Sequence, residues 1–146
     1  MSFSTILVPH DFSPTADRAL EVAKALARAT DAKKLVLAHA HFVPLEIGAL
    51  AVQGVERVYA DIERQATERL EQIGTSLRDE GFNAEFVALQ GAPEHVILEV
   101  VADKKADLIV MGTHARHGLR HLFLGSIAER VLRTAPCPVL TVPPHE

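Results

Sequence analysis

The run DLIVMGTHARHG at residues 107–118, followed by LGSIAER at residues 124–130, carries the strongest structural signal in this chain. Its first apolar residues predict a buried strand that opens directly into a loop at Gly112. Gly125 and Ser126 then begin an amphipathic helix. The first turn of a helix has unpaired backbone N–H groups and the positive end of the helix dipole, so it attracts anions. The pattern predicts a nucleotide-phosphate site, with Ser126 capping the helix or binding the ligand; a capped helix after an ordinary turn is the alternative.

Outward from this run, short apolar segments alternate with helical patterns along the chain. The expected strands are residues 5–8, 35–40, 84–89, 107–111 and 139–142. The expected helices begin at the Ser13-Pro14 cap, run over residues 55–77 and stop before Gly81, begin again at Pro93, and run over residues 126–133. This alternation implies right-handed βαβ units and a parallel sheet with helices on both faces. Ligands of such sheets lie beyond the carboxyl ends of the strands, where the strand order reverses.

Length and composition favour one globular domain over residues 1–146, because 48% of the residues are hydrophobic and 23% are charged. A net charge of −4 argues against general nucleic-acid binding, which needs a basic face. No apolar run approaches the ~20 residues of a membrane span, and no basic segment precedes an apolar stretch at the N-terminus. The single cysteine, Cys137, forbids an internal disulfide and is expected to be a small buried side chain. We therefore expect a cytoplasmic protein that binds neither membranes nor nucleic acid.

Four segments carry a family resemblance. They are ILVPHDFS at 6–13, LAHA at 37–40, GAP at 91–93, and residues 107–142 with PCPV at 136–139. Together they resemble the universal stress protein family, and the likeness covers nearly the whole chain. The ATP-binding branch of that family has Gly, two residues, Gly, nine residues, and then Gly-Ser or Gly-Thr. Here Gly112 and Gly125-Ser126 fall in register, with residues 116–124 between, whereas Ala115 replaces the second glycine.

The resemblance implies a flavodoxin-like, Rossmann-like sheet of five parallel strands in the order 3-2-1-4-5. In that order Asp11, at the end of the first strand, lies beside Gly112, at the end of the fourth. By position, Asp11 would accept from the adenine amino edge, Pro9 would line the base, and the Ala40 backbone would read the other edge. The resemblance thus implies a site for ATP or AMP, with Mg²⁺ as a candidate companion, made by Pro9, Asp11, Ala40, Met111, Gly112, Ala115, Arg116, Gly125, Ser126 and Ile127. An acid at position 11 could instead simply favour the helix start.

Ala115 departs from the family pattern, and its effect depends on the loop. If the position requires a left-handed conformation, alanine costs roughly 1–2 kcal/mol, or about tenfold in affinity. If φ is near −60°, alanine costs almost nothing unless its methyl group faces a phosphate. Arg116, His117 and Arg120 partly offset the change, because cations near a triphosphate strengthen binding. We expect nucleotide binding to be weakened rather than abolished.

Residues for metal binding or catalysis are not evident in the sequence. His114, His117 and His121 fall in an expected loop, and no Cys, Asp or Glu at suitable spacing completes a metal shell. Ser126 lacks the strand–Ser–helix elbow of a nucleophile, and the chain has no GxxxxGK[ST] loop. His39 follows a strand and is either a pocket residue or a hydrogen-bonded core histidine. We expect no catalytic residue and no metal site, with slow ATP hydrolysis by positioning alone as the upper limit.

Three functions are candidates for a chain of this fold class. The first is an adenine-nucleotide-binding, stress-response regulatory protein that acts as a dimer and signals to an unidentified protein partner. The second is a nucleotide-free dimeric interaction module of the same fold with a vestigial pocket, which only Ala115 favours. The third, a flavin- or dinucleotide-binding redox protein, lacks GxGxxG after the first strand. The resemblance implies that the dimer forms through the edge strand Val139–Val142, paired antiparallel with its own copy.

Overall fold

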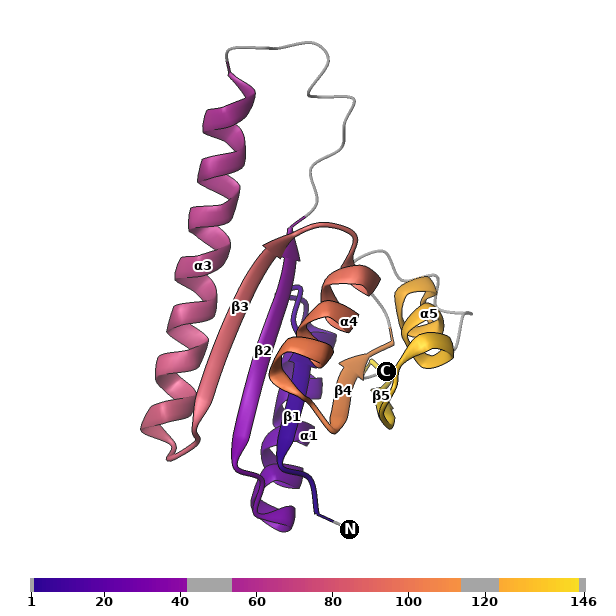
Figure 1. Ribbon diagram of the computed structural model, residues 1–146. Helices are drawn as coiled ribbons and strands as arrows, with labels where there is room; N and C mark the ends of the chain where they lie inside the picture. Colours follow the sequence, from indigo (N-terminus) through magenta and orange to yellow (C-terminus); the bar gives the residue numbers. More distant parts are fainter. Residues whose placement is uncertain (1, 42–53, 114–123, 145–146) are drawn as a thin grey trace.

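The computed structural model describes residues 2–41, 54–113 and 124–144. Along the chain the elements are β1 (Thr5–Pro9), α1 (Pro14–Thr30), β2 (Lys34–His41), α3 (Val55–Asp79), β3 (Ala84–Gln90), α4 (Pro93–Lys104), β4 (Leu108–Gly112), α5 (Ser126–Thr134) and β5 (Val139–Val142). The strands form one parallel five-stranded sheet in the order β3-β2-β1-β4-β5 (Figure 1). The expected α/β fold and strand order are confirmed.

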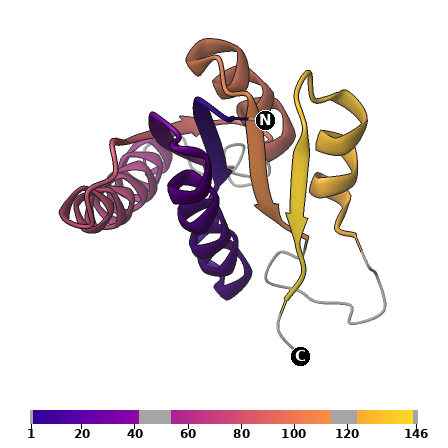
Figure 2. The ribbon, with the colours of Figure 1, turned by 90° about the horizontal axis from the view of Figure 1, so that it is seen from below.

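Alternating side chains of the strands divide the core into two layers. Ile6 and Val8 of β1 belong to the layer covered by α1 and α3, and Leu7 belongs to the layer covered by α4 and α5. Figure 2 shows the two helix pairs on opposite sides of the sheet. All three side chains are fully buried. A central strand covered on both faces needs apolar residues at every position, which is why this segment reads as an unbroken apolar run.

The helix ends follow the sequence signals with one exception. Ser13 caps α1, its Oγ accepting from the backbone N–H of Ala16 at 3.1 Å. Gly81, just beyond the end of α3, takes a left-handed φ of +94° that favours glycine. Of the two alternative roles predicted for Ser126, capping α5 or binding the ligand, the capping role is wrong. The N-cap is Gly125, Ser126 is the first helical residue, and no side chain in the described part of the chain caps this helix.

The beginning of α3 is less buried than its apolar periodicity predicts. Val58 is 47% exposed and Ile62 is 37% exposed, and the first buried side chain described in this helix is Ala66. Figure 1 shows the reason, because the N-terminal part of α3 rises beyond the carboxyl ends of β2 and β3. Although α3 is long, neither it nor any other helix in the described ranges is apolar enough to cross a bilayer.

Candidate functional site

A pocket lies at the carboxyl ends of β1 and β4. These strands are neighbours in the sheet, with Ile6 opposite Leu108 and Leu7 opposite Ile109. The chain proceeds from β1 toward β2 and β3 on one side, and from β4 toward β5 on the other. The strand order therefore reverses between β1 and β4, which is where open α/β sheets bind ligands.

Most of the residues expected in the site line this pocket. They are Pro9, Asp11, Ala40, Met111, Gly112, Gly125, Ser126 and Ile127. The other two, Ala115 and Arg116, lie outside the described residues. The pocket has a volume of about 130 Å³, close to the roughly 150 Å³ of an engineered cavity that holds benzene. It is therefore large enough for a group the size of an aromatic ring.

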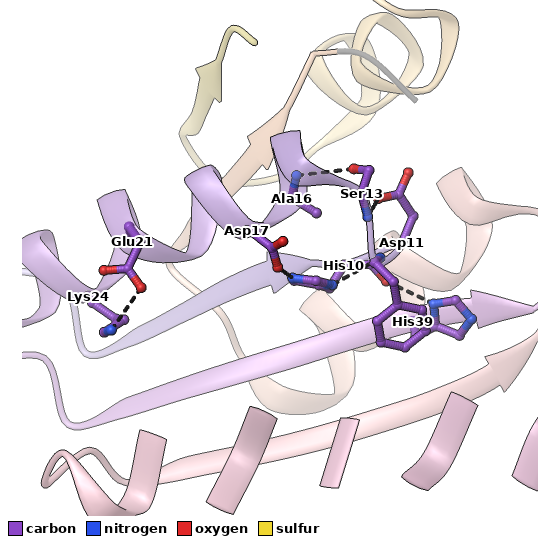
Figure 3. A network of polar contacts seen from close by, with 9 residues as sticks. His10, Asp11, Ser13, Ala16, Asp17, Glu21, Lys24 and His39 are labelled. Atoms are coloured by element: carbon purple, nitrogen blue, oxygen red, sulfur yellow. Dashed lines mark hydrogen bonds and ion pairs between the residues drawn. The ribbon is translucent and has the colours of Figure 1, made fainter. Parts of the chain in front are cut away.

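His10, which the sequence analysis did not single out, is central to the β1–α1 corner. Its side chain is buried, its Nδ1 accepts from the Phe12 backbone N–H at 3.0 Å, and its Nε2 lies 3.1 Å from Asp17 Oδ1 (Figure 3). Because Nδ1 accepts a hydrogen bond, the ring proton is on Nε2 and is donated to Asp17. Burial lowers the pKa of His10 below its usual 6.5, although Asp17 and Asp11 act to raise it. The ring is thus held neutral in one tautomer.

Asp11 follows His10 and forms part of the pocket wall. Its Oδ1 accepts from the backbone N–H of Ser13 at 3.0 Å, and Ser13 in turn caps α1 (Figure 3). Asp11 therefore does support the start of α1, as the alternative interpretation predicts, through its hydrogen bond to the N-cap residue Ser13. That contact also fixes the orientation of the carboxylate at the pocket, so the local and the ligand-binding roles are compatible.

His39 and Phe12 pack against each other beside this corner. His39 Nδ1 donates to the His10 carbonyl oxygen at 2.8 Å, and its ring centroid lies 4.6 Å from that of Phe12. On α3, the guanidinium of Arg69 lies 4.0 Å from the Phe12 ring centroid. Phe12 has a φ of +64°, which costs an L-residue roughly 1–2 kcal/mol. The stacking and the hydrogen bond to His10 hold it there. His39 is both a pocket residue and a hydrogen-bonded histidine, and burial lowers its pKa.

Gly112 is explained by packing within the protein. A Cβ at this position would lie 2.6 Å from Thr15 Cγ2 and 3.2 Å from Thr15 Cβ, both on α1. The close approach of α1 to the end of β4 therefore excludes a side chain at position 112. The sequence indicated only a ligand-related role for this glycine, because its contact with Thr15 joins two segments that are far apart in the chain.

The first turn of α5 forms the opposite wall of the pocket. Gly125 donates its backbone N–H to the Thr113 carbonyl at 2.7 Å, and the residues Gly125 to Ala128 line the pocket. The first N–H groups of a helix have no intrahelical acceptor and carry the positive end of its dipole. This wall therefore presents backbone donors to the pocket.

The described residues form no candidate metal site. Within residues 2–41, 54–113 and 124–144, no group of three His, Cys, Asp or Glu side chains could hold a metal ion. The loop histidines His114, His117 and His121 lie outside these ranges. Cys137 is half-buried rather than fully buried as expected, and burial raises the pKa of its thiol.

The fold and the pocket together define a doubly wound α/β protein with a pocket at its switch point. The model of the universal stress protein family matches residues 2–143, and the chain belongs to this family.

Curated and solved relatives agree with this assignment. The chain is 38% identical over 141 residues to the "universal stress protein in QAH/OAS sulfhydrylase 3'region" of Thermus aquaticus, covering 96% of this chain and 98% of that protein. It is 30% identical to universal stress protein MJ0577 of Methanocaldococcus jannaschii, covering 96% and 94%. A solved structure of MJ0577 matches with a TM-score of 0.88 at 29% identity, covering 100% and 99%. A universal stress protein solved in complex with cAMP matches with a TM-score of 0.62 at 29% identity, covering 97% and 98%.

Proposed function

We propose that this protein binds an adenine nucleotide, ATP or AMP, and acts as a stress-response regulator whose ligand state is recognised by a protein partner. The observation that carries the proposal is the pocket at the β1/β4 switch point, which has the Asp11 carboxylate on one wall and the first turn of α5 on the other. The similar protein solved with cAMP supports an adenine nucleotide as the ligand class.

The adenine ring is assigned to the apolar part of the pocket, which is lined from β2, β4 and α4. Ala38, Val96 and Met111 line the pocket and are buried apolar residues, so they suit the faces of a base. Asp11 supplies an acceptor for the exocyclic amino group. A hydrogen bond to a charged group contributes about 1.5–3 kcal/mol, so this contact would select adenine over a base with a carbonyl at that position.

The phosphates are assigned to the first turn of α5. Backbone N–H groups at a helix start bind phosphate through hydrogen bonds and the helix dipole, and need no particular side chain. Mg²⁺ enters the proposal only as the counter-ion of a bound triphosphate. We assign no catalytic residue, and slow hydrolysis by positioning alone remains the upper limit.

The dimer is assigned to β5. This strand lies at the edge of the sheet, and an edge strand has backbone groups that can pair with another chain. Leu140 in this strand is 39% exposed, whereas Val142 is 4% exposed and belongs to the core. Two copies of Val139–Val142 would pair antiparallel across a two-fold axis. We therefore propose a homodimer with Leu140 close to that axis.

Light scattering at micromolar concentration tests the dimer. The wild-type chain is expected to be dimeric, and Leu140→Asp is expected to be monomeric because it places two like charges near the axis. Ile62→Asp, at an exposed position on α3, is the matched control and should remain dimeric. A monomeric wild-type protein would show that β5 is not an interface. Val142 is unsuitable for this test because a charge there would be buried.

The nucleotide-free interaction module remains the second candidate function. Ala115 favours it, and so does the contact of Gly112 with Thr15, because that glycine is explained without a ligand. Mass spectrometry of the small molecules released from freshly purified, denatured protein separates the two candidates, together with calorimetry using ATP and AMP. Released or titrated adenine nucleotide at one per chain is the expected result. No release and no binding at millimolar nucleotide would favour the second candidate.

A further inference from the structure

Two imidazoles hold the backbone on both sides of Asp11. His10 Nδ1 accepts from the Phe12 N–H at 3.0 Å, and His39 Nδ1 donates to the His10 carbonyl at 2.8 Å (Figure 3). The His10 backbone N–H donates to the Ala38 carbonyl at 2.8 Å. The residues immediately before and after Asp11 are thus fixed by hydrogen bonds, and the position of its carboxylate depends on them.

Only the neutral form of His10 can make this arrangement. In the imidazolium both ring nitrogens carry hydrogen, so Nδ1 would face the Phe12 N–H with a hydrogen of its own. The hydrogen bond would be lost, and one restraint on the left-handed φ of Phe12 would be lost with it. A return of Phe12 to an ordinary φ would rotate the peptide units next to it, which belong to Asp11 and Ser13.

We propose that His10 is a positioning residue for Asp11, and that uptake of a proton by His10 weakens adenine-nucleotide binding. This inference rests on the proposed nucleotide-binding function. His10 acts through the backbone of Phe12 and through its contact with Asp17 on α1, while Asp11 contacts the base. The protein therefore binds nucleotide more tightly at neutral than at acidic pH.

Charged and titratable groups from four segments surround the two imidazoles. They are Asp17 of α1, Asp11 of the connecting segment, His39 and His41 of β2, and Arg69 of α3. Burial is the largest influence on His10 and lowers its pKa below 6.5, against the opposing effect of the two carboxylates. His10 is therefore neutral at pH 7.5, and it becomes protonated only at pH values below 6.5. In that range nucleotide affinity decreases as the pH decreases.

The test is calorimetry with ATP from pH 7.5 to pH 5.0 on the wild type, His10→Asn and Asp17→Asn. Below the pKa of His10, wild-type affinity should fall by up to about tenfold per pH unit, the slope for one linked proton. In His10→Asn, the amide oxygen can accept from the Phe12 N–H and does not titrate, so the part of the pH dependence that comes from His10 should vanish, whatever the affinity of this variant at pH 7.5. Titration of the ATP phosphates is common to all three proteins and cancels in the comparison.

The variant Asp17→Asn provides a second test of the proposal. Its amide oxygen can still accept from Nε2, but the carboxylate that favours the imidazolium is gone, so the loss of affinity should move to lower pH. If His10→Asn does not fold, the shift of the affinity loss to lower pH in Asp17→Asn tests the proposal by itself. An identical pH profile in all folded proteins would overturn the proposal.

Nuclear magnetic resonance without nucleotide separates this inference from the proposed function. Long-range ¹H–¹⁵N spectra should show His10 protonated on Nε2 at pH 7.5, and the Ser13 amide should shift with the titration of His10, because its acceptor is Asp11. If both results are obtained but the protein binds no ATP, the proposed function is refuted, whereas the assignment of His10 as the residue that positions Asp11 still stands. A His10 protonated on Nδ1, or a Ser13 amide that does not follow it, would overturn the inference.

Discussion

The two walls of the pocket are built from different chemical groups. At the β1–α1 corner, side chains restrain the backbone, as His10 accepts from Phe12, Asp11 accepts from Ser13, and Ser13 caps α1. At the start of α5 the N-cap is a glycine without a side-chain cap from any described residue, and the contact to Thr113 joins two backbones. One wall depends on side-chain identity, whereas the other depends on the path of the main chain.

This difference explains why one departure from the family motif need not abolish binding. A wall made of backbone donors tolerates many side chains, provided that each fits the local φ and leaves room for the ligand. A wall made of side chains in fixed protonation states tolerates few. The effects of substitutions on nucleotide binding should therefore differ between the two walls, both in magnitude and in physical cause.

Asp11→Ala should have the largest effect on binding. Loss of the charged acceptor at the side-chain wall should weaken ATP binding by about 1–3 kcal/mol, or about 5- to 150-fold in Kd. Calorimetry at pH 7.5 measures it. Asp11→Asn, which keeps an oxygen that can accept from Ser13, should lose less. Unchanged affinity in a folded Asp11→Ala protein would remove Asp11 from the site.

Gly112→Ala tests the junction between the two walls. The new Cβ would meet Thr15 Cγ2 at 2.6 Å, so the free energy of unfolding should fall by about 1–2 kcal/mol, at the lower end of the cost of overpacking because one carbon is added. Urea denaturation measures the change. Combining it with Thr15→Ser, which removes Cγ2, should restore part of the loss. Full stability of Gly112→Ala would contradict the packing explanation of this glycine.

Ser126 allows the backbone wall to be tested by a pair of variants. Proline is tolerated at the first helical position, so Ser126→Pro removes one N–H with little cost to α5. Ser126→Ala keeps the N–H and removes only the hydroxyl. If the backbone binds phosphate, the proline variant should bind ATP more weakly than the alanine variant by about 1 kcal/mol. Equal affinities, with helicity checked by circular dichroism, would argue against backbone recognition at this position.

Ala115→Gly should cause the smallest loss of affinity, because it is expected to cause none. A glycine removes either φ strain or a contact between the methyl group and a phosphate, so ATP affinity should stay equal or rise by up to about tenfold. Calorimetry beside the wild type measures this. A large loss of affinity in the folded variant would refute this account of the loop.

The fold could be predicted because its signals are local. The Ser13-Pro14 start of α1, the apolar run of β1 and the glycine after α3 each reflect the conformation of their own segment. The exposure of Val58 and Ile62 could not be predicted, because periodicity shows which face of a helix is apolar but not how far the sheet beneath it extends.

The candidate site could be predicted only in part. The resemblance indicated Asp11 and the start of α5, which line the pocket. The Ser13 cap and His39 were also indicated, but the stacking of Arg69 on Phe12 and the contact of Thr15 with Gly112 were missed, because each joins distant parts of the chain. The spacing of His10 and Asp17 gave no recognisable pattern, since their contact depends on how α1 leaves the end of β1.

The close approach of Thr15 to Gly112 also has a mechanical consequence. Thr15 lies in the first turn of α1, between the cap at Ser13 and Asp17, which bonds to His10. The same turn is thus wedged against the end of β4 and tied to the end of β1. A sliding motion of α1 toward β4 would collide with main-chain atoms, and protein interiors resist such compression. This side of the pocket is therefore tightly packed, and we expect a change of shape on ligand binding to come from segments other than α1.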